Sequence, residues 1–114
     1  MDTLDLARTI VNALEEKKGE DIVLLDIHEV AFFADYFVIC SGTSDRMLQA
    51  LADSAIEQVK KKYDLYARVE GLANHGWILV DFGDVIVHLF APERREYYKL
   101  ESLWSAGKIL LHLQ

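Results

Sequence analysis

The sequence has very little cysteine and proline. Its single cysteine, Cys40, excludes an internal disulfide and a cysteine-based zinc cluster. The surrounding letters FVIC predict a buried strand position, where cysteine usually acts as a small hydrophobic residue. One proline and six glycines leave no obvious linker, and 114 residues suit one domain over residues 1–114.

Long apolar runs are also missing. No run approaches the roughly 18 residues that a transmembrane helix requires. The opening letters MDTLDLAR resemble neither a secretory signal nor an Arg-rich transit peptide. We therefore expect a cytoplasmic protein of a reducing compartment that makes no membrane contact.

Positive charge is scarce, because 12 Lys and Arg face 19 Asp and Glu, for a formal net charge of −7. This balance argues against a broad basic face for nucleic acid. An acidic protein suits a basic partner, such as a ribosomal or nucleic-acid-binding protein, although acidity also aids solubility. Hydrophobic residues make up 52% of the chain, which is enough for a core.

Apolar spacing predicts a helix over residues 4–14 that ends near Gly19, and a long helix that Ser44 opens and residues 60–63 close. Short apolar runs predict strands at 21–27, 36–40 and 66–70. Residues 28–35 stay ambiguous between a helical turn and a loop that tucks Phe32 and Phe33 inward.

A β-hairpin is the clearest local signal. Strands 77–82 and 85–90 are joined by Gly83-Asp84, which fits a two-residue primed turn. Pro92 begins a helical end region, which the apolar letters ILLHL follow. We expect an α/β fold in the order α-β-β-α-β-β-β-α. Its mixed sheet has about five strands, and the unit from strand 36–40 through the long helix to strand 66–70 is the parallel crossover.

The turn fixes the hairpin register and therefore its two faces. One face is wholly apolar and is predicted to meet the core; it carries Ile78, Val80, Phe82, Val85, Val87 and Leu89. The other face places a carboxylate and an imidazole among apolar residues; it carries Trp77, Leu79, Asp81, Ile86, His88 and Phe90. Either the end region covers this second face, or the face is open and binds a protein.

Acids and aromatics follow the hairpin closely. On a helix, Tyr97, Glu101 and Trp104 would share one side. Acids around aromatic anchors suit a target with exposed Lys and Arg, although Tyr98 and Trp104 also fit core positions. The predicted protein-binding residues are Trp77, Leu79, Asp81, His88, Phe90, Glu93, Glu96, Tyr97, Tyr98 and Glu101.

The stretch Gly42–Asp45 raises an enzyme alternative, because strand, small residues and helix start also describe phosphate sites. Nucleotidyl transfer needs paired carboxylates on a strand to hold Mg²⁺, whereas residues 66–70 offer only Glu70. The four histidines show no metal-ligand spacing, and no P-loop lysine follows Gly42. We expect no catalytic residue, cofactor or metal. A Cys40–His dyad and residual anion binding at the turn stay open.

Several motifs together resemble the ribosomal silencing factor family, also called Iojap-like. They are ADYFVICSGTSDR at 34–46, Glu70-Gly71, GWILVDFGDVIVHLF at 76–90 and REYYKLESLW at 95–104. The tail after residue 104 and Met47 depart from the family pattern. The resemblance implies a non-enzymatic factor with a nucleotidyltransferase-like fold, whose contact surface includes Trp77, Leu79, Asp81, Tyr97 and Tyr98.

The resemblance also implies a partner. Such factors bind the large ribosomal subunit through large-subunit ribosomal protein fourteen, and their bulk blocks joining of the small subunit when nutrients are scarce. The alternative is a nucleotide-binding or nucleotidyl-transferring enzyme that uses Gly42–Asp45. A homodimer formed through the second hairpin face and proximity to ribosomal RNA are further possibilities that the sequence leaves open.

Overall fold

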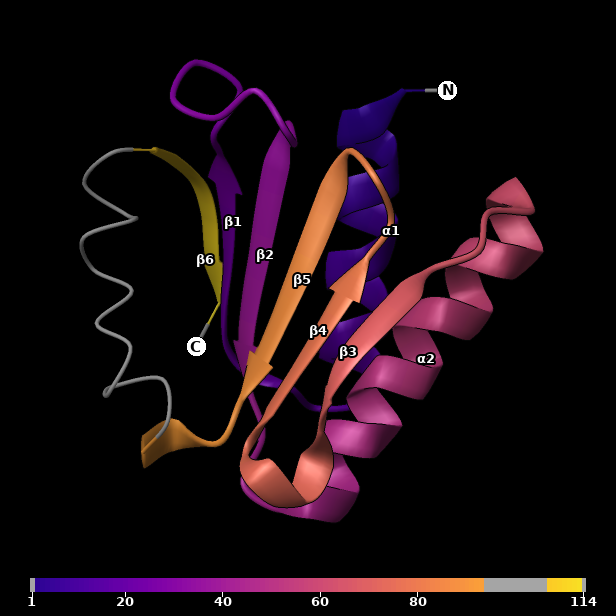
Figure 1. Cartoon of the computed structure of the whole chain (residues 1–114), viewed down its shortest axis with the longest axis vertical. Helices are drawn as coiled ribbons and strands as arrows, with labels where there is room; N and C mark the ends of the chain where they lie inside the picture. Colours follow the sequence, from indigo (N-terminus) through magenta and orange to yellow (C-terminus); the bar gives the residue numbers. More distant parts are fainter. Residues whose placement is uncertain (1, 94–106, 114) are drawn as a thin grey trace.

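A computed structural model describes residues 2–93 and 107–113 of the chain. The described helices are α1 (Thr3–Glu16), α2 (Asp45–Tyr63) and the short 3-10 helix η1 (Ala73–His75). The strands are β1 (Glu20–Asp26), β2 (Tyr36–Ser41), β3 (Arg68–Leu72), β4 (Trp77–Asp81), β5 (Val85–Phe90) and β6 (Lys108–Leu113). In Figure 1 the strands form one twisted sheet, and α1 and α2 lie together behind it.

Both long helices have capped starts and one apolar stripe. Asp2 accepts a hydrogen bond from the Leu4 N–H at 3.0 Å, and Ser44 accepts one from the Met47 N–H at 3.0 Å. The buried stripe of α1 consists of Leu6, Ala7, Ile10, Val11, Ala13 and Leu14. In α2 the buried residues are Leu48, Leu51, Ala52, Ser54, Ala55 and Val59. The helical spacing of the sequence is therefore confirmed in both segments.

The α1–β1 connection depends on a glycine. The Gly19 N–H donates to the Leu14 carbonyl at 2.9 Å and so closes the end of α1. A Cβ added at Gly19 would lie 2.5 Å from the Cys40 Sγ. The close approach of this turn to β2 thus requires glycine. It also confirms that Cys40 occupies a buried strand position.

The described sheet has six strands in the order β3-β4-β5-β2-β1-β6. The expected count of about five was too low, because residues 108–113 pair antiparallel with β1. A leucine-rich run such as ILLHL fits a helix or a strand equally well, and its pairing partner lies far away in the sequence. The structure also places β3 at Arg68–Leu72, slightly later than predicted.

The parallel neighbour of β2 is β5, a pairing that the sequence left open. The expected parallel crossover from β2 through α2 to β3 is confirmed, since β3 runs in the same direction as β2 in the same sheet, with β4 and β5 between them. β4 pairs antiparallel with both β3 and β5, so two tight connections carry the chain back from the sheet edge. β5 then docks beside β2 and completes the mixed sheet.

Each sheet face has its own apolar cluster. The larger cluster joins α1 and α2 to inward residues of β1, β2, β4 and β5. The smaller cluster lies on the other side of the sheet and contains Val23, Leu25, Ile27, Ala34, Phe37, Ile39 and Phe90. Trp77 and Ile86 pack against its border. The side of the sheet away from α1 and α2 is therefore also substantially apolar.

The segment between β1 and β2 is a loop, but its aromatic residues do not tuck inward. Phe32 is 103% exposed and Phe33 is 59% exposed. Of the two alternatives that the sequence left open, the loop is present, but it does not tuck these two side chains inward. Phe37, on β2, takes the corresponding place in the smaller cluster, with 8% exposure. The predicted helix beyond Pro92 falls mainly on residues 94–106, which lie outside the described residues.

Candidate protein-binding face

The β4–β5 hairpin has the register that its two-residue turn predicts. Trp77 lies opposite Phe90, Leu79 opposite His88, and Asp81 opposite Ile86. The Phe82 N–H donates to the Val85 carbonyl at 2.9 Å. Gly83 has a φ of 93°, and an added Cβ would meet nothing within 4 Å, so the turn needs this glycine for its backbone conformation alone.

The two hairpin faces differ in burial, and the predicted core face is the buried one. All six residues of the predicted core face are at most 4% exposed. On the other side, which we call the hairpin face, Trp77, Leu79, Asp81, Ile86 and His88 are only partly buried. Phe90 is the exception at 2% exposure, because it belongs to the smaller apolar cluster. Phe90 is therefore part of the buried cluster and contributes almost no exposed surface to the hairpin face.

Neighbouring strands extend the hairpin face into three rows. β3 contributes Leu72 beside Trp77, Glu70 beside Leu79, and Arg68 beside Asp81. On the other side, β2 places Phe37 beside Ile86, Ile39 beside His88, and Ser41 beside Phe90. β3 is exposed along its whole length, whereas the β2 residues are largely buried. Exposure therefore increases across the hairpin face, from the buried residues of β2 to the exposed residues of β3 at the sheet edge.

Trp77 is held by a glycine on the neighbouring strand. Gly71 has a φ of 84°, and a Cβ there would lie 2.5 Å from the Trp77 carbonyl oxygen and 2.8 Å from its ring Cε3. The indole therefore lies close against the Gly71 backbone. Glu70-Gly71 is one of the motifs that carry the family resemblance, but no local pattern predicts a packing role for this glycine. The sequence signal for this contact is a glycine in one strand, followed after a short loop by an aromatic residue at the start of the next strand.

His88 lies in an aromatic environment. Its ring makes an edge contact with Phe37 at 4.8 Å between centroids and stacks on Phe90 at 6.0 Å. Its Nε2 is buried and has no hydrogen-bond partner in the described structure. Burial lowers the pKa of His88 to about 4, so its imidazole is neutral at physiological pH. A neutral His88 contributes a polar atom to the hairpin face without contributing charge.

The acidic residues do not all gather in one place. Asp81 lies at the turn end of the hairpin, where its carboxylate accepts a hydrogen bond from the Gly83 N–H at 2.7 Å. Glu93 follows the opposite end of β5 and lines a cavity of about 240 Å³ with Asp45, Asn74, His75, Gly76 and Ala91. The structure therefore does not bring Glu93 beside Asp81. Glu96, Tyr97, Tyr98 and Glu101 lie outside the described residues.

The Gly42–Asp45 turn uses its polar groups to hold the fold. The Gly42 N–H donates to the Phe90 carbonyl at 3.0 Å, and the Ser44 hydroxyl caps α2. A Cβ at Gly42 would lie 3.0–3.2 Å from side-chain atoms of Met47, Leu48 and Leu51, so the turn is tightly packed. Over residues 2–93 and 107–113, no group of three or more acidic, histidine or cysteine side chains is placed to hold a metal ion.

No helix in the described ranges is long and apolar enough to span a membrane.

The architecture defines a class, namely a small α/β domain with both long helices on one side of a mixed sheet and a partly exposed apolar face on the other. Comparison with known proteins identifies the family within this class. The family model described as "Ribosomal silencing factor during starvation" matches residues 1–112.

Similar proteins agree with this match. Ribosomal silencing factor RsfS of Bacillus subtilis is 38% identical over 92% of this chain and 89% of its own length. Mitochondrial assembly of ribosomal large subunit protein 1 of Mus musculus is 37% identical over 84% of this chain and 43% of its own length. A crystal structure of a Chromobacterium violaceum protein superposes with a TM-score of 0.87 at 32% identity, covering 97% of this chain and 94% of that chain. The chain belongs to the ribosomal silencing factor family.

Proposed function

We propose that this protein binds the large ribosomal subunit through large-subunit ribosomal protein fourteen. Its bulk then prevents the small subunit from joining, which represses translation under nutrient limitation. The protein acts by occupying space and not by catalysis. The observation that carries the proposal is the partly exposed hairpin face, on which Trp77 and Leu79 stand beside Asp81.

The apolar part of the hairpin face supplies the proposed anchor. Large aromatic side chains at the centre of an interface often contribute most of the binding free energy. Trp77 fits this role, because the neighbouring Gly71 backbone limits the positions that its indole can take. Leu79 lies in the next row, beside the partly buried His88 of the paired strand. Little side-chain entropy is lost when such a preorganised surface binds.

The charge of the protein supports a basic protein partner. With a formal net charge of −7, the chain is repelled by ribosomal RNA and attracted to a basic ribosomal protein. Asp81 places one carboxylate directly on the hairpin face. Charges at the border of an interface mainly accelerate encounter and add salt dependence. We therefore expect binding to weaken as ionic strength rises.

Co-sedimentation with purified ribosomal subunits tests the proposal. We expect the wild type to sediment with large subunits and to lower the yield of joined ribosomes in a subunit-joining assay. Trp77→Ala should weaken both effects by about a hundredfold, the scale of a central aromatic anchor. Val69→Ala is the matched control, since Val69 is 52% exposed on the neighbouring strand and belongs to the other side of the sheet.

Two results would contradict the proposal. One is wild-type co-sedimentation by a folded Trp77→Ala protein, which would remove the hairpin face as the contact. The other is binding to large subunits with no effect on subunit joining, which would remove the steric mechanism. A crosslink from position 79 to a ribosomal protein other than the fourteenth would identify a different partner.

A further inference from the structure

The loop between β1 and β2 presents apolar side chains to solvent. Phe32 is 103% exposed, Phe33 is 59% exposed, and Val30 is 57% exposed. Single exposed apolar residues are ordinary, but three within four positions of one loop form a patch. Such a patch indicates an interaction surface.

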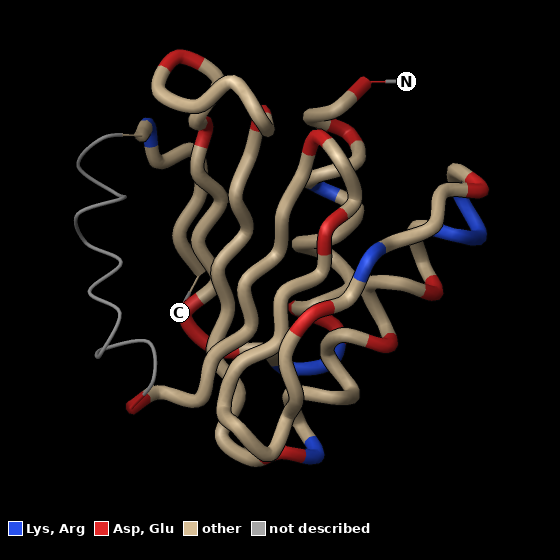
Figure 2. Tube along the Cα trace, in the orientation of Figure 1, with Lys and Arg blue, Asp and Glu red and all other residues tan. Residues whose placement is uncertain are grey.

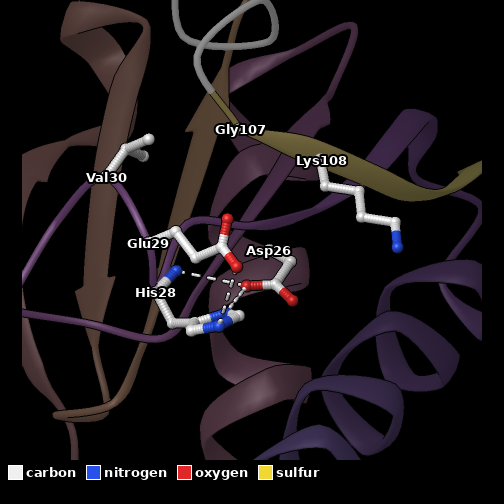
Figure 3. A pocket seen from close by; sticks show the side chains of 6 residues that line it. All are labelled: Asp26, His28, Glu29, Val30, Gly107 and Lys108. Atoms are coloured by element: carbon white, nitrogen blue, oxygen red, sulfur yellow. Dashed lines mark hydrogen bonds and ion pairs between the residues drawn. The ribbon is translucent and has the colours of Figure 1, made fainter.

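Hydrogen bonds hold this loop in its shape. The Ile27 N–H donates to the Asp35 carbonyl at 2.9 Å, and the Ala31 N–H donates to the Ile27 carbonyl at 2.8 Å. At its base, the backbone N–H and the ring of His28 both bond to the Asp26 carboxylate, as Figure 3 shows. The exposure of Phe32 is therefore a consequence of a closed, internally bonded loop.

Ring contacts connect the patch to the hairpin face. Phe32 and Phe33 make an edge contact at 6.4 Å between ring centroids, and Phe33 lies 6.1 Å from Phe37. Phe37 in turn contacts the ring of His88, a member of the hairpin face. An unbroken series of rings thus connects the loop with the hairpin.

The loop is also attached to the β4–β5 turn. The Asp84 carbonyl accepts hydrogen bonds from the backbone N–H groups of Asp35 at 2.8 Å and Tyr36 at 3.1 Å. In Figure 1 the loop and the turn lie at the same end of the sheet. A partner that covers the hairpin face at this end therefore meets the loop as well.

The surroundings of the patch are acidic. The Glu29 side chain is 86% exposed, and Asp35 and Asp84 flank the loop and the turn. Figure 2 shows acidic positions along this end of the molecule. Lys108 is a cation close to the loop, where it lines one pocket with Glu29 and Val30 (Figure 3). This charge opposes contact with nucleic acid and with a second copy of the same acidic end. It favours a protein segment in which Lys or Arg accompanies an apolar side chain.

We propose that Phe32, Phe33, Glu29 and Asp84 form a second contact, the loop site, for a basic segment of a ribosomal protein on the large subunit. The inference rests on the proposed function and adds to it a contact outside the residues predicted from sequence. The rings supply apolar area, and the carboxylates pair with the cations of the segment. Together with Trp77, the loop site would make two anchors on one side of the sheet.

The test is co-sedimentation of purified large ribosomal subunits with five proteins over a salt series: the wild type, Trp77→Ala and the three variants described next. Phe32→Ser should weaken binding about tenfold, as expected for an exposed aromatic contact near the edge of an interface. Its thermal unfolding should match the wild type, because Phe32 is fully exposed. Glu29→Gln should reduce the salt dependence of binding. Tyr66→Ser is the matched control, since Tyr66 is 69% exposed and stacks with Lys60 of α2.

The outcomes separate this inference from the proposed function. If Trp77→Ala weakens binding while Phe32→Ser binds like the wild type, the loop site is wrong and the proposed function stands. If neither variant weakens binding, both are wrong. Binding of protein-free large-subunit RNA that depends on Phe32 would identify RNA as the occupant and overturn the loop site. If light scattering shows that Phe32→Ser turns a dimer into a monomer, the occupant is a second copy of the chain, and the loop site is overturned as well.

Discussion

The indole ring of Trp77 occupies the space in which a side chain at position 71 would lie. A Cβ at Gly71 would be 2.8 Å from the ring Cε3, and the φ of Gly71 is 84°. Position 71 therefore needs glycine for two reasons: its backbone is left-handed, and the volume that a side chain would fill is taken by the indole. The position of the most prominent aromatic residue on the hairpin face depends on both.

Gly71→Ala should displace the indole and destabilise the protein. The left-handed backbone and the collision together should cost about 2–4 kcal/mol of unfolding free energy. Gly83→Ala is the matched control, since it has a φ of 93° but open space around it, and it should cost about 1 kcal/mol. Urea unfolding followed by tryptophan fluorescence measures both. Equal losses for the two variants would show that the indole does not restrict position 71.

His88 should make the protein sensitive to acid. Its pKa falls to about 4 in the folded state because of burial, against 6.5 in the unfolded chain. The unfolded chain therefore binds more protons between these values, so stability is full above pH 6.5 and declines as the pH falls towards 4. The wild type should lose about 2 kcal/mol between neutral pH and about pH 5.

The variant His88→Leu removes the titrating group and checks this expectation. Its unfolding free energy should change less over the same interval in urea unfolding at matched pH values. His28 acts in the opposite sense, because Asp26 raises its pKa and its contribution is lost as the pH rises. A His88→Leu protein with the same acid loss as the wild type would assign the effect to other groups.

Gly19 and Cys40 should be energetically coupled. A Cβ at Gly19 would lie 2.5 Å from the Cys40 Sγ, so Gly19→Ala should cost about 2–3 kcal/mol through overpacking. Cys40→Ala alone should leave a small cavity and cost about 1–2 kcal/mol. The double variant should be more stable than the sum of the two losses predicts, which a double-mutant cycle in urea measures. Simple additivity would mean that the two residues do not collide.

The Gly42–Asp45 turn should not bind nucleotides. The Ser44 hydroxyl caps α2, and the Gly42 N–H donates to the Phe90 carbonyl. Two groups that could contact a phosphate are therefore already hydrogen-bonded within the protein. Titration calorimetry with nucleoside triphosphates and Mg²⁺ should give no saturable heat. Ser44→Ala should instead lower stability by about 1 kcal/mol through loss of the cap. Tight saturable binding that Ser44→Ala abolishes would restore the nucleotide alternative.

Local chemistry explains which parts of the fold were predictable. The two-residue turn at Gly83 fixed the pairing of Trp77 with Phe90 and Asp81 with Ile86, because register follows from turn length. Capping by Ser44 and the apolar periods of α1 and α2 followed equally from neighbouring residues. Each of these features depends on contacts within a few positions of the chain.

Other features depend on residues far apart and could not be read in this way. β5 pairs with β2, and β6 pairs with β1, only after the intervening segments have folded. The outward direction of Phe32 depends on the loop bonding to Asp84, and the burial of Phe90 depends on the cluster around Phe37. Periodicity carries no information about such distant partners.

The sequence by itself determined the helices α1 and α2, the hairpin register and the family, because these depend on local spacing and on motifs. Only the tertiary structure decided which side chains of the hairpin face reach solvent. It buried Phe90, separated Glu93 from Asp81, and placed the exposed loop beside the β4–β5 turn. The physical reason is that exposure is set by what packs on a residue from elsewhere in the chain, and that is settled only when the sheet is assembled.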